Sequence, residues 1–257
     1  MQPIVSRTKS IGLIGHVIAC YPDHKAALAM MAAMVEQGVA AIEVQIPFSE
    51  PMADGPLFMK ANQDALQAGV TVARAWDFIK DASETLRVPI VTMTYANVAF
   101  KAGLGAFARR MIQAGSHHLI VPDFPIDAGI DLLTPLAEAG VGWIPLLAPS
   151  TDVVRMEQLT SAGSGFAYCV ARAGVTGAKS EIDSSTKQYL QGARAHSKLP
   201  TAVGFGIQDG AGVSSLIGVA DFAIVGSKTL ATFRSGGLSA VSQFWSSLKV
   251  AAGGLKT

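Results

Sequence analysis

The sequence has few charged residues and very little cysteine. Only 15% of its 257 residues are charged, and the formal net charge is +1. The charges form no basic cluster, which argues against nucleic acid as a main partner. The two cysteines, Cys20 and Cys169, lie in strand-like segments, so the pattern is neither a disulfide framework nor a metal site. These features are typical of a reducing compartment, and we expect a cytoplasmic protein.

Long hydrophobic runs are also missing. Although 50% of the residues are hydrophobic, no uncharged stretch reaches the roughly 20 residues that a membrane helix requires. We therefore expect no membrane partner. Arg7 and Lys9 precede an apolar segment, residues 11–20, and together they imitate a secretory signal. The alternative is that residues 11–20 hold the first buried strand, and we favour it because the rest of the chain requires that strand.

Short apolar strands alternate with helical segments along the whole chain. The expected strands span residues 14–19, 41–45, 88–94, 117–121, 143–147, 166–170, 201–204 and 222–225. The expected helices span residues 23–37, 57–67, 72–86, about 96–113, 128–138, 152–159, 186–196, 211–217 and 238–250, with a short helix near 228–232. Asp23, Thr71 and Thr151 are the expected N-caps of three of these helices.

This alternation predicts an α/β protein with a parallel sheet and right-handed crossovers. Eight strand–helix units in about 250 residues favour a closed (β/α)8 TIM barrel. No linker divides the chain, so we expect one domain, residues 1–257. In such a barrel the chemistry takes place at the carboxyl ends of the strands.

Two acids near the second strand are candidates for catalysis. Glu43 lies in the middle of the strand 41–45, where period 2 places it on one face with Ala41 and Gln45. A carboxylate buried in a strand is costly unless it is paired or has a function. Asp54 follows on a proline-rich loop that we expect to face solvent. Two such acids suit acid–base chemistry, but a bonded core glutamate and a helix-capping aspartate would give the same pattern.

Glycine-rich turns follow the last three strands. They are A-G-V-T-G at 173–177, G-F-G-I at 204–207 and V-G-S at 225–227. Glycine allows a ligand to approach backbone N–H groups closely, and a helix N-terminus favours an anion. In barrels, the loops after strands 7 and 8 commonly hold a phosphate. The pattern therefore favours a phosphorylated ligand, although any tight turn uses glycine.

These residues resemble the tryptophan synthase alpha subunit family over nearly the whole chain after residue 14. The matching segments are I-E-V-Q-I-P-F-S-E-P-M-A-D-G-P (42–56), A-N-Q-D-A-L-Q-A-G-V-T (61–71), Y-A-N (95–97), R-A-G-V-T-G (172–177), G-F-G-I (204–207) and V-G-S (225–227). The core of the first segment and the order of the others make the resemblance specific. It implies a TIM barrel, as the strand pattern does.

The resemblance also implies an activity, the reversible retro-aldol cleavage of indole-3-glycerol phosphate to indole and glyceraldehyde 3-phosphate. Glu43 matches the general acid–base of the family, and Asp54 matches the carboxylate that stabilises positive charge on the indole. The implied substrate-binding residues are Tyr95, Tyr168, Thr176, Gly177, Phe205, Gly206, Gly226 and Ser227. The resemblance implies no metal or cofactor in this chain, and a beta subunit as partner in an alpha2beta2 heterotetramer.

Several residues depart from the family pattern. Gln45 stands where a small glycine is usual, and there it could hydrogen-bond Glu43 or narrow the pocket. His16 replaces a usual aromatic residue, Met59 a usual glutamine and Glu50 a usual aspartate. These departures leave two alternatives open. The chain could be a stand-alone indole-3-glycerol phosphate lyase, or a degenerate alpha-like subunit that mainly binds and activates a beta partner.

Overall fold

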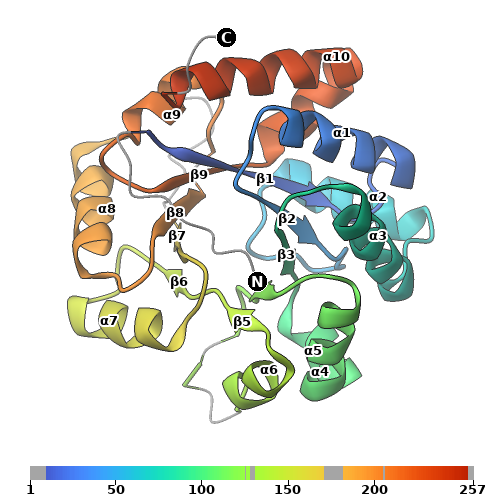
Figure 1. Ribbon diagram of the computed structural model, residues 1–257, viewed down its shortest axis with the longest axis horizontal. Helices are drawn as coiled ribbons and strands as arrows, with labels where there is room; N and C mark the ends of the chain where they lie inside the picture. Colours follow the sequence, from blue (N-terminus) through green and yellow to red (C-terminus); the bar gives the residue numbers. More distant parts are fainter. Residues whose placement is uncertain (1–9, 125, 128–130, 171–181, 205, 254–257) are drawn as a thin grey trace.

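The strands form one curled parallel sheet with helices on its outside (Figure 1). The computed structural model describes residues 10–124, 126–127, 131–170, 182–204 and 206–253. In this part of the chain the strands are β1 (Gly12–Ile18), β2 (Ala41–Gln45), β3 (Ile90–Met93), β4 (His118–Ile120), β5 (Gly142–Trp143), β6 (Leu146–Leu147), β7 (Ala167–Val170), β8 (Thr201–Gly204) and β9 (Phe222–Val225). Their order in the sheet is β5-β4-β3-β2-β1-β9-β8-β7-β6.

Two of these strands, β5 and β6, together occupy one strand position of the barrel. We predicted a single strand over residues 143–147, but the structure divides it into β5 and β6 around Ile144 and Pro145. Ile144 N–H still donates to Leu119 of β4 at 2.9 Å, and the carbonyl of Pro145 accepts from Tyr168 N–H at 2.8 Å. Proline has no N–H of its own, so at Pro145 the strand cannot keep regular backbone hydrogen bonds to both of its neighbours. With β5 bonded to β4 and β6 to β7, the barrel is closed.

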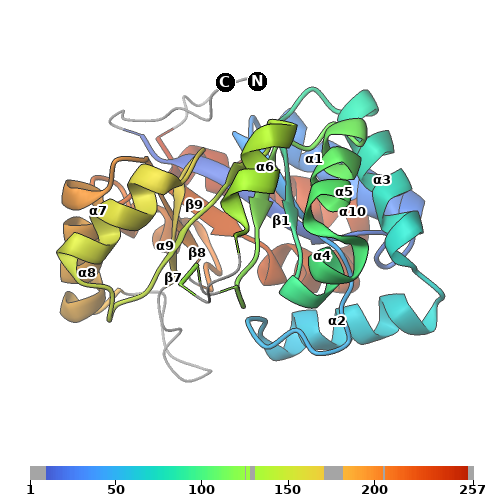
Figure 2. The same cartoon turned by 90° about the horizontal axis from the view of Figure 1, so that it is seen from below.

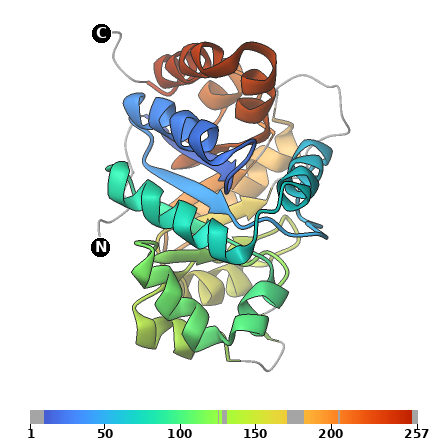
Figure 3. The same ribbon diagram turned by 90° about the vertical axis from the view of Figure 1, so that its right-hand side faces the viewer.

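The helices surround this barrel. They are α1 (His24–Glu36), α2 (Pro56–Gln67), α3 (Val72–Thr85), α4 (Ala96–Ala102), α5 (Leu104–Gln113), α6 (Leu133–Ala139), α7 (Val153–Ala162), α8 (Ser184–His196), α9 (Gly210–Ser215) and α10 (Ser227–Ala251). Seen from the side, α10, α1, α3 and α5 follow one another along the outside (Figure 3). By contrast, α2 lies beyond the ends of the strands (Figure 2). The helix that follows the Asp54 loop therefore lies at one end of the barrel.

Most helix limits agree with the expected ones, and four regions differ. The helical material expected over about 96–113 is two helices, α4 and α5, with Gly103 between them. Asp23 and Thr71 are N-caps as predicted, but α7 is capped by Asp152 rather than Thr151, because the Asp152 carboxylate accepts the N–H of Arg155. The expected helix 128–138 begins only at Leu133 within the described residues. The two helices expected near the C-terminus are one element, α10, with a kink at Gly237, whose φ of 64° breaks the helical backbone.

The alternation within β2 determines which side chains enter the barrel. Ile42 and Val44 pack in the outer core against the helices, whereas Ala41 belongs to the cluster inside the barrel. That inner cluster includes Ile14, Val91, Phe166 and other residues that fill the interior. Glu43 therefore faces inward, as its period predicted. The segment that imitates a secretory signal is β1, which pairs with both β2 and β9.

Candidate active site

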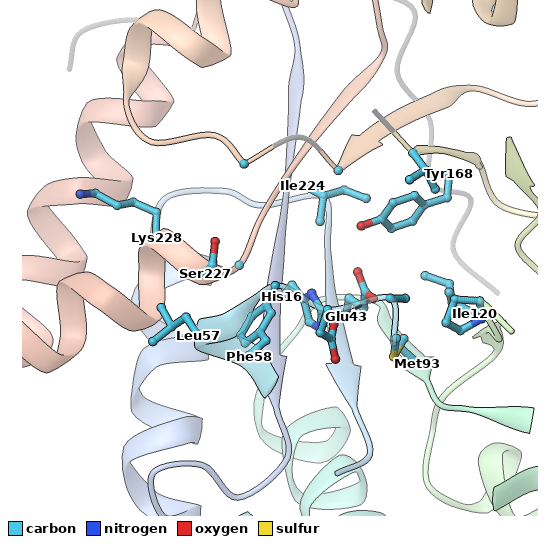
Figure 4. A pocket seen from close by; sticks show the side chains of 18 of the residues that line it. His16, Glu43, Leu57, Phe58, Met93, Ile120, Tyr168, Ile224, Ser227 and Lys228 are labelled. Carbon is cyan, nitrogen blue, oxygen red and sulfur yellow. Dashed lines mark ion pairs between the residues drawn. The ribbon is translucent and has the colours of Figure 1, made fainter. Parts of the chain in front are cut away.

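A cavity of about 580 Å³ opens at the carboxyl ends of the strands. Glu43 lies between two groups of its lining residues, with Ser227 and Lys228 on one side and Tyr168 and Ile120 on the other (Figure 4). The cavity is the functional-site candidate because it joins two acids, a glycine-rich end and an apolar wall. The apolar residues include Leu57, Phe58, Met93, Ile120, Leu146 and Ile224.

Glu43 is a buried acid, and one of its carboxyl oxygens makes no hydrogen bond within the described residues. Its side chain is 2% exposed, and within the described residues its Oε2 atom has no hydrogen-bond partner. Burial raises the pKa of Glu43 to about 8, and the negative charge of Asp54 adds to this rise. At neutral pH the side chain is therefore mostly a neutral carboxylic acid. Such a group can deliver a proton to a ligand in the cavity.

His16 lies beside Glu43 but does not neutralise it. Its Nε2 atom is 3.7 Å from Glu43 Oε1, which is too long for a hydrogen bond. Burial lowers the pKa of His16 to about 4, so the imidazole is neutral at pH 7. Its ring packs against Phe58 with 4.6 Å between ring centroids. The contact with Glu43 is thus one between two neutral groups.

Asp54 is held more firmly than the sequence suggested. The loop faces solvent, as expected, since Met52 is 84% exposed, but Asp54 itself is only partly exposed and borders the cavity. Its Oδ2 atom accepts from Gln45 Nε2 at 2.6 Å, Asn62 Nδ2 at 3.3 Å and Tyr95 OH at 3.5 Å. Burial raises the pKa of Asp54, while these three donors act against the rise. Asn62 was not singled out in the sequence, because a side chain that supports a loop carries no local signal.

The two tyrosines occupy different places. Tyr168 lines the cavity and lies so close to Gly204 that a Cβ atom there would be 2.2 Å from its hydroxyl oxygen. Tyr95 is buried behind the Asp54 loop rather than on the cavity wall. Its hydroxyl oxygen accepts the N–H of Ala53 at 3.0 Å, and its ring stacks on Phe48. In this structure Tyr95 supports the loop, while Tyr168 is open to a ligand.

The glycine-rich end of the cavity is formed by Gly206, Gly226 and Ser227. Gly226 directly follows β9 and is the N-cap residue of α10, whose first residue is Ser227. Amide groups at such a helix start suit an anion. Lys228, which the sequence analysis did not select, also lines this end. The other predicted binding residues, Thr176, Gly177 and Phe205, lie outside the described residues.

The departures from the family pattern have separate surroundings. Gln45 is fully buried and contacts Asp54 and His16 rather than Glu43. Met59 is 40% exposed and does not line the cavity, and Glu50 is also exposed. Across the part of the chain that the structure describes, no three His, Cys, Asp or Glu residues are grouped as a metal site. The same residues include no helix long and apolar enough to cross a membrane.

The fold and the cavity define a class, a (β/α)8 barrel with an acid pair and a glycine-rich helix start in its mouth. The comparisons with known proteins agree. The family model described as tryptophan synthase alpha chain matches residues 5–253. This chain therefore belongs to the tryptophan synthase alpha chain family.

Individual relatives match the chain over nearly its full length. The tryptophan synthase alpha chain of Syntrophotalea carbinolica is 42% identical over 241 residues, which cover 94% of this chain and 95% of the relative. The alpha chain of Desulfotalea psychrophila is 42% identical over 243 residues, or 95% and 96% of the two chains. Among solved structures, a chain of the tryptophan synthase a2b2 complex from Pyrococcus furiosus is 29% identical with a TM-score of 0.86, covering 95% of this chain and 99% of that one. A chain of aminoacrylate-bound tryptophan synthase from M. tuberculosis is 30% identical with a TM-score of 0.84, covering 95% and 94%.

Proposed function

We propose that this chain is the lyase subunit of a tryptophan synthase, which cleaves indole-3-glycerol phosphate to indole and glyceraldehyde 3-phosphate. One observation carries the proposal, which is that the buried acid Glu43 shares the cavity with Asp54. The apolar wall suits a flat indole ring, and the glycine-rich end suits a phosphate. Membership of the alpha chain family supports the same reaction.

The proposed chemistry begins with the proton on Glu43. The acid protonates C3 of the indole, which places positive charge on the ring and its nitrogen. The carboxylate of Asp54 stabilises that charge. Glu43, now ionised, takes the proton of the hydroxyl group on the carbon attached to C3. The bond between C3 and that carbon then breaks, its electron pair returns to the ring, and an aldehyde forms. Glu43 gives one proton and takes one back, so it returns to its acid form at the end of the reaction.

The proposed binding residues divide between the two ends of the substrate. Tyr168 and the apolar wall would contact the indole, and Tyr95 would act through the loop that carries Asp54. Gly206, Gly226 and Ser227 would bind the phosphate through backbone N–H groups and the Ser227 hydroxyl. We also propose Thr176, Gly177 and Phe205 as substrate-binding residues, on their match to the family motifs alone.

The pH dependence of the reaction follows from the two acids. We expect kcat/KM to fall as pH rises through about 8, because the pKa of Glu43 is raised to about 8 and its acid form is lost above it. Activity should also fall toward low pH, where Asp54 becomes neutral and can no longer stabilise a cation. The two limbs belong to a coupled pair of carboxyl groups. Initial rates measured between roughly pH 5 and pH 10 test this, and undiminished activity at the alkaline end would contradict the role of Glu43.

A beta subunit is the proposed protein partner. One solved relative is a chain of the tryptophan synthase a2b2 complex of Pyrococcus furiosus. Here the loop between β2 and α2 presents Met52, which is 84% exposed, beside Asp54. An exposed methionine on a loop next to the site suits docking of a partner that receives the product. We propose an alpha2beta2 assembly, and one barrel domain formed by residues 1–257. Cys20 and Cys169 are free, buried thiols, which supports a reducing compartment such as the cytoplasm.

A turnover assay separates this function from its alternatives. Purified protein is incubated with indole-3-glycerol phosphate, with and without a beta subunit, and indole release and native mass are measured. We expect indole in both cases, faster turnover with the beta subunit, and an alpha2beta2 mass. Equal rates without assembly would indicate a stand-alone lyase. No indole in either case would indicate a degenerate subunit, which we do not favour because Glu43 and Asp54 both border the cavity.

A further inference from the structure

Gln45 joins the two sides of the candidate site. The side chain is fully buried at the end of β2, on the inward face that also carries Glu43. Its Nε2 atom donates to Asp54 Oδ2 at 2.6 Å, and its Oε1 atom is 3.1 Å from His16 Nε2. The amide therefore bridges the loop after β2 to the neighbouring strand β1.

The hydrogen-bonding capacity of each group fixes the direction of this bridge. An ionised carboxylate can only accept, so the Gln45 NH2 group must face Asp54. The Gln45 oxygen then faces His16 and needs a donor, which places the single proton of the neutral imidazole on Nε2. That N–H points to Gln45 at 3.1 Å, whereas Glu43 Oε1 is 3.7 Å away. The His16 N–H, which could have stabilised an ionised Glu43, is thus engaged by Gln45.

The same bridge has opposite effects on the two acids. Donation by Gln45 favours the charged form of Asp54, which is the form that can stabilise a cation. Engagement of His16 by Gln45 makes the His16 N–H unavailable to an ionised Glu43, and Glu43 Oε2 has no hydrogen-bond partner among the described residues. Neighbouring carboxyl groups with different roles need surroundings that separate their protonation states. Gln45 supplies this separation from one position.

We propose that Gln45 is the positioning residue of the acid pair, holding Asp54 over the cavity as a carboxylate and keeping the N–H of His16 away from Glu43. The proposal rests on the proposed lyase function for its consequence in catalysis. The titratable groups that face the pair are His16 from β1, Tyr95 after β3 and Tyr168 from β7. Lys228 from α10 lines the same cavity. Of the side chains that contact Asp54, Gln45 makes the shortest hydrogen bond.

The main test replaces Gln45 with leucine, which has similar size but no hydrogen-bonding group. We expect Gln45→Leu to lower kcat by about 10- to 100-fold with little change in KM, because a hydrogen bond to a charged group is lost. The acidic limb of the pH profile should move to higher pH. Gln188→Leu on the exposed face of α8 is the matched control, and we expect it to behave as the wild type.

A second readout does not depend on turnover. The carboxyl titration of Asp54 is followed by ¹³C NMR in free protein, with the signal assigned by its loss in Asp54→Asn. Gln45→Leu should move this titration to higher pH, whereas Gln188→Leu should not. If the Asp54 titration shifts in Gln45→Leu but the wild-type protein cleaves no indole-3-glycerol phosphate, the lyase function is contradicted and the proposed role of Gln45 at Asp54 is retained. An unchanged titration in a folded Gln45→Leu protein overturns the proposal.

A second pair of variants covers the case in which Gln45→Leu does not fold. His16→Leu removes the donor to the Gln45 oxygen, while His16→Gln keeps an N–H that can donate to it. We expect the Asp54 titration to move upward in His16→Leu and to stay near the wild type in His16→Gln. If His16 instead acted on Glu43 directly, the Glu43 titration would change and that of Asp54 would not, which also overturns the proposal.

Discussion

Replacement of Glu43 by glutamine is expected to remove nearly all indole release while the barrel remains folded. Glutamine fills the same space but cannot give a proton to C3 of the indole or take one from the hydroxyl group. General acid–base groups contribute about 10²- to 10⁴-fold, so we expect kcat to fall by about 10³-fold. KM should change little, because the lost interaction forms only as the proton moves. Initial rates of indole formation measure both quantities.

The fold of the Glu43→Gln variant should persist for an electrostatic reason. Because the pKa of Glu43 is raised to about 8, the buried side chain is already mostly neutral at pH 7. A neutral amide then replaces a neutral acid, and no buried charge loses its partner. Glu36→Gln, at the exposed end of α1, is the matched control. Near-normal indole release by Glu43→Gln would show that the proton comes from another group.

Replacement of Asp54 by asparagine is the second large effect that we expect. The variant keeps the shape of the loop but loses the negative charge that faces the developing cation. Removal of one preorganised electrostatic group commonly costs about 10²- to 10³-fold in kcat, and we expect a loss of that size. The titration of Glu43 should move to lower pH, because the charge of Asp54 is one cause of its raised pKa. Enzyme kinetics and carboxyl NMR test the two effects separately.

The control for Asp54→Asn is a surface acid. Asp77→Asn changes an exposed carboxylate whose ion pair with Arg110 spans 3.5 Å, and such pairs contribute little to stability. It should leave kcat and the Glu43 titration unchanged. If Asp54→Asn kept substantial activity, the positive charge would have to be stabilised by another group. If the Glu43 titration did not move, the two acids would not be coupled across the cavity.

Much of the fold follows from local patterns. The limits of β2, β8 and β9 agree with the predicted strands, because short apolar runs between turn residues need little tertiary information. Residues 143–147, which include Pro145, were predicted as one strand because their apolar residues form one run. Its division depends on which neighbour each backbone group must bond, and that is settled only when the barrel closes. Helix ends differed for a similar reason, as at Asp152, where two adjacent residues could both serve as caps.

The candidate site was predictable in part. Period 2 was enough to turn Glu43 inward, and burial then accounts for its raised pKa. The solvent-facing loop that carries Asp54 was predicted, but the hydrogen bonds that hold its carboxylate were not, because their donors come from three separate elements. Gln45 shows the same limit. The strand pattern placed Gln45 on the same face of β2 as Glu43. That its side chain hydrogen-bonds Asp54 and His16 rather than Glu43 depends on how the loop after β2 folds back.

The division of one strand into β5 and β6 also affects which part of the barrel is most rigid. Glu43 is carried by a strand whose residues pair with β1 from Ala41 to Gln45 and with β3 from Ile42 to Gln45. On the far side of the ring, β5 and β6 each pair with one neighbour over two residues only. Local opening begins where backbone hydrogen bonds are fewest. Local opening of the barrel would therefore start around Pro145, and the strand that carries Glu43, the proposed proton donor, would open last.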